Sequence, residues 1–176
     1  MAGYTSIAQH TTGTDLVDNI NLLFGHLREL LRRQRGTLAD VPGDAFFAYW
    51  EPEAGVVTAR HALEFALLAD GAVRRIAPDL TLRNPDGSTI SMGWAIVAGE
   101  VAISPNGASV LGDATNLAFR LSGLAGREGR PSVLVTRRIR QEAGDGIVFG
   151  KGVDVAVKGR TGTETVFSAA FASGLR

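Results

Sequence analysis

The chain has 176 residues, of which 45% are hydrophobic and 20% charged, a composition that favours a globular domain over a disordered segment. Its 18 basic and 18 acidic residues cancel, so no global charge favours nucleic acid or an anionic membrane. The absence of cysteine excludes disulfides, thiol nucleophiles and thiolate metal sites. Without a signal peptide or an apolar stretch that could span a bilayer, we expect one cytoplasmic domain over residues 1–176, with neither membrane nor nucleic acid as a partner.

Hydrophobic periodicity predicts a first helix over Thr14–Arg35, with Thr12 or Thr14 as its N-cap and Gly36 closing it. The stretch Thr37–Trp50 then predicts two paired strands joined by the turn Val41-Pro42-Gly43-Asp44. Proline presets the second position of a type II turn, and glycine tolerates the positive φ of the third.

Asp44 follows this turn at the mouth of the hairpin. A carboxylate fixed at a rigid strand end can hold a hard cation. The alternative is that Asp44 only closes the turn, and this stretch alone favours that simpler role.

A second amphipathic helix is predicted over Thr58–Ile76, and a buried strand over Thr89–Val97 that Gly99–Ile103 continues. Gly112-Asp113 opens a third helix, in which leucines form the apolar side. Asn116 and Arg120 are four residues apart and share a different, polar face of this helix.

The C-terminal part predicts a short strand at Ser132–Val135, a short helix at Thr136–Ala143, and a closing pair of strands at Val153–Lys158 and Thr163–Phe171. The order of elements predicts an α+β fold in which helices cover one mainly antiparallel sheet.

Four short motifs resemble the class III nucleotidyl cyclase catalytic domain, a ferredoxin-like module that makes cyclic AMP or cyclic GMP. The resemblance extends from Gly3-Tyr4-Thr5 over nearly the whole chain. Each motif alone is weak, but their order and spacing are specific. They are Gly43-Asp44, Gly99-Glu100-Val101, the helix from Gly112-Asp113 through Asn116 to Arg120, and Val157-Lys158-Gly159.

The resemblance implies attack of a ribose 3′ hydroxyl on the α-phosphate of a nucleoside triphosphate, supported by two Mg²⁺ or Mn²⁺ ions. It assigns metal binding to Asp44, ribose orientation to Asn116, stabilisation of the transition-state charge to Arg120, and the terminal phosphates to Lys158. Members act as head-to-tail homodimers, with the metal aspartates from one subunit and the Asn and Arg from the other. Apolar side chains near the hairpin should therefore be exposed in a lone domain; the candidates are Phe46, Tyr49, Trp50 and Phe119.

The sequence departs from the family at the first metal aspartate, which belongs three residues before the glycine of an Asp-x-x-Gly-Tyr-Thr motif. That glycine is Gly3, so the matching position precedes Met1, and the strand that carries it is not in the sequence. Either the start is internal to a longer reading frame, or one metal ligand and one strand have been lost. Loss of one of two carboxylates should weaken ion binding and slow turnover.

The base pocket also departs from the family. The two positions that select the base, a lysine and an aspartate for adenine, are Asp40 and Ser109 here. Aspartate accepts from an exocyclic amine but cannot donate to adenine N1 unless it is protonated. This pair leans towards guanine, or towards no preference.

Three functions remain open at this stage. The first is a nucleotidyl cyclase, weak in this form, supported by Asp44, Asn116, Arg120 and Lys158. The second is a pseudo-cyclase that dimerises or binds a nucleotide without turnover. The third, an unrelated role such as RNA binding, lacks the aromatic motifs and basic excess it would need.

Overall fold

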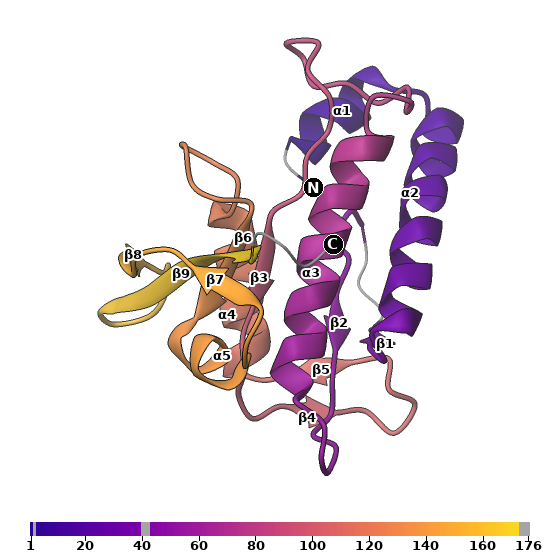
Figure 1. Cartoon of the computed structure of the whole chain (residues 1–176). Coiled ribbons are helices and arrows are strands. Elements are labelled where there is room, and N and C mark those ends of the chain that lie inside the picture. The colour runs from indigo at the N-terminus through magenta and orange to yellow at the C-terminus, as the bar shows by residue number, and fades with distance from the viewer. Residues whose placement is uncertain (2, 40–42, 173–176) are drawn as a thin grey trace.

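The computed structural model describes residues 1, 3–39 and 43–172 (Figure 1). Three long helices match the sequence prediction: α2 (Gly13–Arg33), α3 (Thr58–Ile76) and α4 (Asp113–Leu124). The other helices are α1 (Tyr4–His10) and α5 (Arg137–Glu142). The strands are β1 (Thr37–Leu38), β2 (Ala48–Tyr49), β3 (Trp94–Ile96), β4 (Ala102–Ile103), β5 (Val110–Leu111), β6 (Val133–Thr136), β7 (Ile147–Phe149), β8 (Val153–Ala156) and β9 (Thr163–Phe171).

The largest sheet has the order β3-β6-β9-β7, with β8 also paired to β9. Strands β3 and β6 are parallel, with Trp94 opposite Val133, whereas β9 is antiparallel to β6, β7 and β8. The fold is therefore α+β with a mainly antiparallel sheet, as the sequence predicts.

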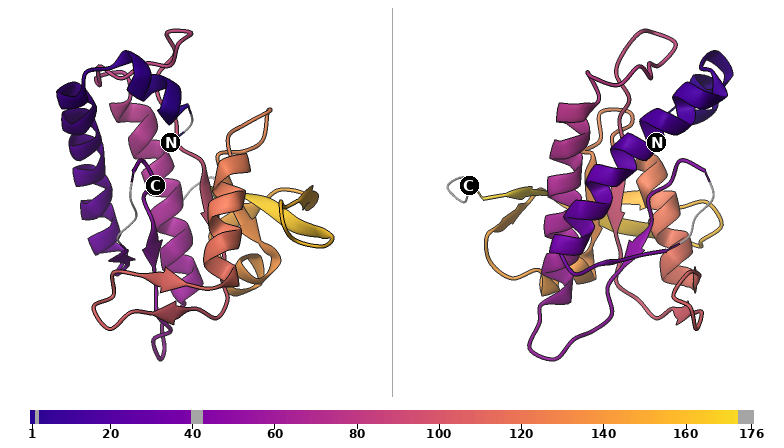
Figure 2. Two further views of the ribbon diagram at one scale, coloured as in Figure 1. Left: turned by 180° about the vertical axis from the view of Figure 1, so that it is seen from behind. Right: turned by 90° about the vertical axis from the view of Figure 1, so that its right-hand side faces the viewer.

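Helices cover both faces of this sheet. Successive side chains of a strand point to opposite faces, so neighbouring residues of β6 pack against different helices. Val133 and Val135 of β6 join the core cluster that contains the buried residues of α2 and α3. Leu134, between them, joins a second cluster with Leu117 and Leu121 of α4. Figure 1 shows α2 beside α3, and the two views of Figure 2 show the β8–β9 hairpin projecting away from both helices.

The predicted hairpin between the first two long helices is present as β1 and β2, paired antiparallel with Thr37 opposite Tyr49. Val41 and Pro42 lie outside the described residues, but Gly43 has a φ of +92°, in the positive region that the turn prediction requires. The paired stretch is shorter than expected, since Ala45–Phe47 precede β2 outside any strand and add one further backbone bond, from Ala39 N to Phe47 O at 3.0 Å.

Aromatic contacts place this hairpin between the two helical layers. The Phe46 ring packs on Phe24 of α2 and Phe65 of α3, with ring centroids 5.3 and 5.8 Å away. The next side chain, Phe47, packs on Phe119 of α4 at 5.1 Å. Adjacent side chains thus reach α2 and α3 on one side and α4 on the other.

The prediction that Gly99–Ile103 continues the main sheet is wrong. Residues 97–101 are in no strand, and β4 pairs with β5 in a separate two-stranded sheet. The buried strand expected over Thr89–Val97 is a strand only at Trp94–Ile96, with an isolated antiparallel bridge from Thr89 to Arg83, although Ile90 and Met92 are buried in the core. Burial of these side chains does not require their backbone to pair with a neighbouring strand.

The capping predictions for the first long helix are half right. Thr12 is the N-cap of α2, and its Oγ1 accepts a hydrogen bond from Asp15 N at 3.2 Å. At the other end, the left-handed residue is Arg35, with φ of +56°, and not Gly36. Gly36 is needed for space, because a Cβ there would collide with Leu31 and Trp50.

Among residues 1, 3–39 and 43–172, none of the helices combines the length and hydrophobicity that a bilayer crossing needs.

Candidate active site

Helix α4 carries Asn116 and Arg120 on its exposed side. Its opposite side is anchored by Leu117 and Leu121, which are buried against β6, β8 and β9. Because residues four apart lie above one another on a helix, the two polar side chains share one face. The sequence prediction of a polar face beside a leucine stripe is therefore confirmed.

The turn Val157–Arg160 presents Lys158 next to this face. Its closing hydrogen bond runs from Arg160 N to Val157 O, 3.1 Å, and Gly159 has a φ of +75°, close to the value that a type II turn requires at its third position. Lys158 is at the second position and is exposed. A Cβ built on Gly159 would lie 3.0 Å from Nη1 and 3.2 Å from Nη2 of Arg120. The guanidinium group of Arg120 thus lies against the backbone of the turn.

An ion pair joins the same turn to the start of α4. Arg160 Nη2 lies 2.7 Å from Asp113 Oδ2, and Arg160 Nη1 lies 3.8 Å from Glu164 Oε2. Sequence reasoning assigned no role to Arg160. The available signal was its position directly after Lys158-Gly159, in a chain whose helix motif begins with an acid.

The Gly99-Glu100-Val101 motif packs against the N-terminus of α4. A Cβ on Gly99 would lie 2.7 Å from the Cβ of Ala114, and one on Gly112 would lie 2.9 Å from Glu100 O. Both glycines allow close approach of the backbone. Three of the four motifs recognised in the sequence therefore meet around one helix.

Asp44 comes from the segment between β1 and β2. Within the described part of the chain it makes no hydrogen bond or ion pair with Asn116, Arg120 or Lys158. Its half-buried carboxylate pairs instead with the α-ammonium group of Met1, 2.6 Å from Oδ2. No group of three or more His, Asp or Glu side chains that could hold a metal ion occurs among the residues described.

This donor set does not fit a divalent ion held by the protein alone. A single carboxylate does fit an ion that arrives with a nucleotide, because Mg²⁺ is commonly bound by one or two carboxylates together with substrate phosphates and water.

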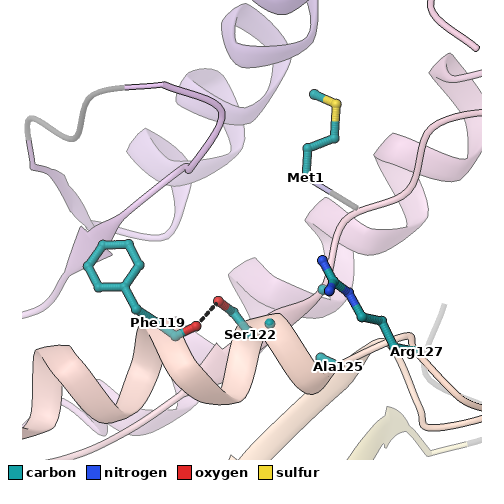
Figure 3. A pocket seen from close by; sticks show the side chains of 7 residues that line it. Met1, Phe119, Ser122, Ala125 and Arg127 are labelled. Atoms are coloured by element: carbon teal, nitrogen blue, oxygen red, sulfur yellow. Dashed lines mark hydrogen bonds between the residues drawn. The ribbon is translucent and has the colours of Figure 1, made fainter. Parts of the chain in front are cut away.

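A small cavity of about 100 Å³ lies on the side of α4 that faces Met1 (Figure 3). Figure 3 shows Phe119, Ser122 and Arg127 along one wall, with the Ser122 hydroxyl donating to Phe119 O at 2.9 Å. Met1 lies across from them. Through Met1, this cavity connects the surroundings of Asp44 with α4.

The predicted base-binding pair is only partly described. Asp40 lies outside the described residues. Ser109 is exposed at the end of the turn before β5, where its N–H donates to Ser104 Oγ at 2.9 Å. No described residue joins Ser109 to Asn116, Arg120 or Lys158, so the base pocket stays a prediction.

The aromatic residues expected to be exposed are mostly packed within the chain. Phe46, Tyr49 and Trp50 are half-buried; the Tyr49 hydroxyl donates to Gly107 O at 3.3 Å, and the Trp50 indole donates to Gln34 O at 2.7 Å. Phe119 is 38% exposed despite its contact with Phe47. Leu111 of β5 is more exposed than Phe119, at 69%.

Solved structures with this architecture were found by comparison. The guanylyl cyclase Cya2 superposes with a TM-score of 0.74 at 18% identity, over 99% of this chain and 89% of that one. The chain has the class III nucleotidyl cyclase fold. The guanylate cyclase domain of RhGC from Catenaria anguillulae, in complex with GTP, gives a TM-score of 0.69 at 20% identity, over 97% of this chain and 91% of that one.

The adenylyl cyclase CyaB from P. aeruginosa gives a TM-score of 0.70 at 15% identity, over 98% of this chain and 91% of that one. No protein-family model matches the sequence, and no curated protein matches it either. The cyclase fold recognised from the four motifs is thus confirmed by structure, at identities that carry no residue roles with them.

Proposed function

We propose that residues 1–176 form one nucleotidyl cyclase domain that converts ATP or GTP to the 3′,5′-cyclic monophosphate and pyrophosphate in intracellular signalling. The observation that carries the proposal is the Val157–Arg160 turn, in which Gly159, next to Lys158 in the sequence, lies against the guanidinium group of Arg120 on the polar face of α4. Two cations and an amide on one exposed face suit a polyphosphate attached to a ribose.

In the proposed reaction, the ribose 3′ oxygen bonds to the α-phosphorus, the bond to the β-phosphate oxygen breaks, and pyrophosphate leaves while the hydroxyl proton passes to solvent. Negative charge builds on the α-phosphoryl oxygens and on the leaving group. Arg120 stabilises the first charge, Lys158 binds the terminal phosphates, and Asn116 orients the ribose. Asp44 would hold a divalent ion, Mg²⁺ or Mn²⁺, together with the nucleotide phosphates, and such an ion would lower the pKa of the 3′ hydroxyl and offset the charge of the triphosphate.

The proposed assembly is a head-to-tail homodimer. It is supported by the contacts of Asp44 within one chain, which among the described residues include no hydrogen bond or ion pair with Asn116, Arg120 or Lys158. Leu111 and Val101, at 69% and 37% exposed, are apolar side chains of the β4–β5 region that a second copy would cover.

Two substitutions test the roles separately. Lys158→Ala should weaken nucleotide binding, because it removes a charged contact that is present before the reaction. Arg120→Ala should leave binding nearly unchanged and reduce kcat by about 10²- to 10³-fold, the loss typical of one transition-state donor. Equal effects of both substitutions on binding alone would contradict these assignments.

The second candidate is a catalytically inactive pseudo-cyclase that dimerises or binds a nucleotide. The observation in its favour is that the described residues hold no group of three or more His, Asp or Glu side chains that could bind a metal ion. Asp44→Ala separates the two candidates. For a cyclase it should abolish nucleotide binding that depends on a divalent ion, and for a pseudo-cyclase it should leave nucleotide binding as it was.

A further inference from the structure

The turn that carries Lys158 is fixed to α4 at both of its ends. At the first end, Val157 is buried at 4% exposure in the cluster that contains Leu117 and Leu121. At the second end, Arg160 forms its 2.7 Å ion pair with Asp113, the first residue of the helix. These contacts join residues that are 36 to 47 positions apart in the sequence. They therefore tie the turn to α4 in addition to the local pairing of β8 with β9.

The charges around this ion pair show why it matters for Lys158. Lys158, Arg120 and Arg160 bring three cations to one turn and one helix face, and like charges repel. Asp113 and Glu164 both approach Arg160, whereas neither forms an ion pair with Lys158 or Arg120. Arg160 is therefore neutralised within the protein, and the other two cations face solvent.

We propose that Arg160 and Asp113 are positioning residues that hold the Lys158-Gly159 turn against Arg120 for a polyphosphate. The pair contacts no substrate; it acts by fixing where the Lys158 ammonium group lies relative to the guanidinium of Arg120. This inference rests on the proposed function, since it names the residues that organise the same phosphate-binding surface.

The size of the effect follows from exposure. Arg160 is 35% and Asp113 72% exposed, so solvent screens the pair, and its removal should weaken polyphosphate binding by about two- to fivefold. A positioning pair predicts equal losses in Arg160→Gln and Asp113→Asn, and no further loss in the double variant. Exchange of the charges, Asp113→Arg with Arg160→Asp, should recover part of the affinity.

If Arg160 instead binds phosphate directly, the result differs. Asp113→Asn would then release the guanidinium for the ligand, so affinity would stay the same or increase, while Arg160→Gln alone would weaken it. That outcome would overturn the positioning role. A matched control is the exposed pair of Arg138 and Glu142 on α5, at 2.8 Å, whose removal should leave binding unchanged.

The experiment is calorimetric titration with inorganic tripolyphosphate and Mg²⁺ for each variant. Loss of binding in Lys158→Ala, with no effect of the Arg160 and Asp113 variants, overturns this inference and leaves the proposed function standing. No effect of Lys158→Ala on binding overturns the proposed function.

A measurement without ligand tests the inference whether or not the proposed function stands. The ¹⁵N–¹H heteronuclear NOE of Gly159 should fall in Arg160→Gln and in Asp113→Asn to the same extent, because the turn loses its anchor on α4. An unchanged value in both variants would overturn the inference, whatever the nucleotide result.

Discussion

Gly159→Ala tests the contact between the Lys158 turn and Arg120. Gly159 has a φ of +75°, where an alanine costs about 1–2 kcal/mol, and its new methyl group would lie 3.0 Å from Arg120 Nη1. That distance is too short for a relaxed contact, so the guanidinium group has to move by a few tenths of an ångström. The substitution therefore has two effects: it strains the backbone of the turn, and it displaces the guanidinium group of Arg120.

Gly162→Ala is the matched control, because Gly162 lies in the same loop with a φ of +87° and no atom within 4 Å of a built Cβ. It carries the same backbone strain without the contact to Arg120. Since a misplacement of about 1 Å can cost about 10²-fold in rate, we expect kcat/KM to fall about tenfold or more in Gly159→Ala and about threefold or less in Gly162→Ala.

The assay is steady-state turnover of ATP and GTP with Mn²⁺, with urea unfolding of each variant to compare the strain. In an Arg120→Ala background, Gly159→Ala should have no larger effect than Gly162→Ala, because the displaced group is gone. Equal losses in the two glycine variants of the otherwise unchanged protein would refute the contact as a determinant of the site.

Two further predictions concern stability and its dependence on pH. Leu121→Ala, at 0% exposure on the buried side of α4, should lower the free energy of unfolding by about 2–5 kcal/mol, whereas Leu111→Ala, at 69% exposure, should change it by about 0.5 kcal/mol or less. Hydrogen bonds from Arg32 and Arg33 lower the pKa of Glu29 from 4.5 to about 2. The stability this carboxylate adds is present above pH 4.5 and lost towards pH 2, so wild type and Glu29→Gln should differ in urea midpoint at pH 7 and converge at pH 2. A difference that persists at pH 2 would contradict this.

The long helices could be predicted from sequence because their apolar residues recur every three or four positions. Helix α1 was missed, since Ile7 is its one buried residue and no acid marks its first turn. Strand β7 was missed because three residues give no usable alternation, and only pairing with β9 makes them a strand. In both cases the decisive contacts are with distant parts of the chain.

The candidate site could likewise be predicted only where its residues are close in the sequence. The spacing of Asn116 and Arg120 already implied a shared helix face. The approach of the Lys158 turn to Arg120 was not implied by any local pattern, because it depends on how β8 and β9 pack on α4. Gly159 was recognisable as part of a family motif, but its physical reason, contact with a guanidinium group, required the structure.

The same dependence on distant contacts explains the ion pair of Arg160 with Asp113. Both residues are ordinary exposed charges in the sequence, 47 positions apart. Only the packing of Val157 beneath the turn brings them together.

The measurement that tests the central claim most directly is turnover of ATP and GTP, in parallel, by the chain with Mn²⁺, with the cyclic product detected by mass. Mn²⁺ is the suitable probe because it binds oxygen and nitrogen ligands more tightly than Mg²⁺ does, which helps a site with one carboxylate. A nucleotidyl cyclase predicts a 3′,5′-cyclic monophosphate from at least one nucleotide, lost in Asp44→Ala and strongly reduced in Arg120→Ala. No cyclic product from either nucleotide, under conditions where the chain binds both, would contradict the cyclase assignment and favour the pseudo-cyclase.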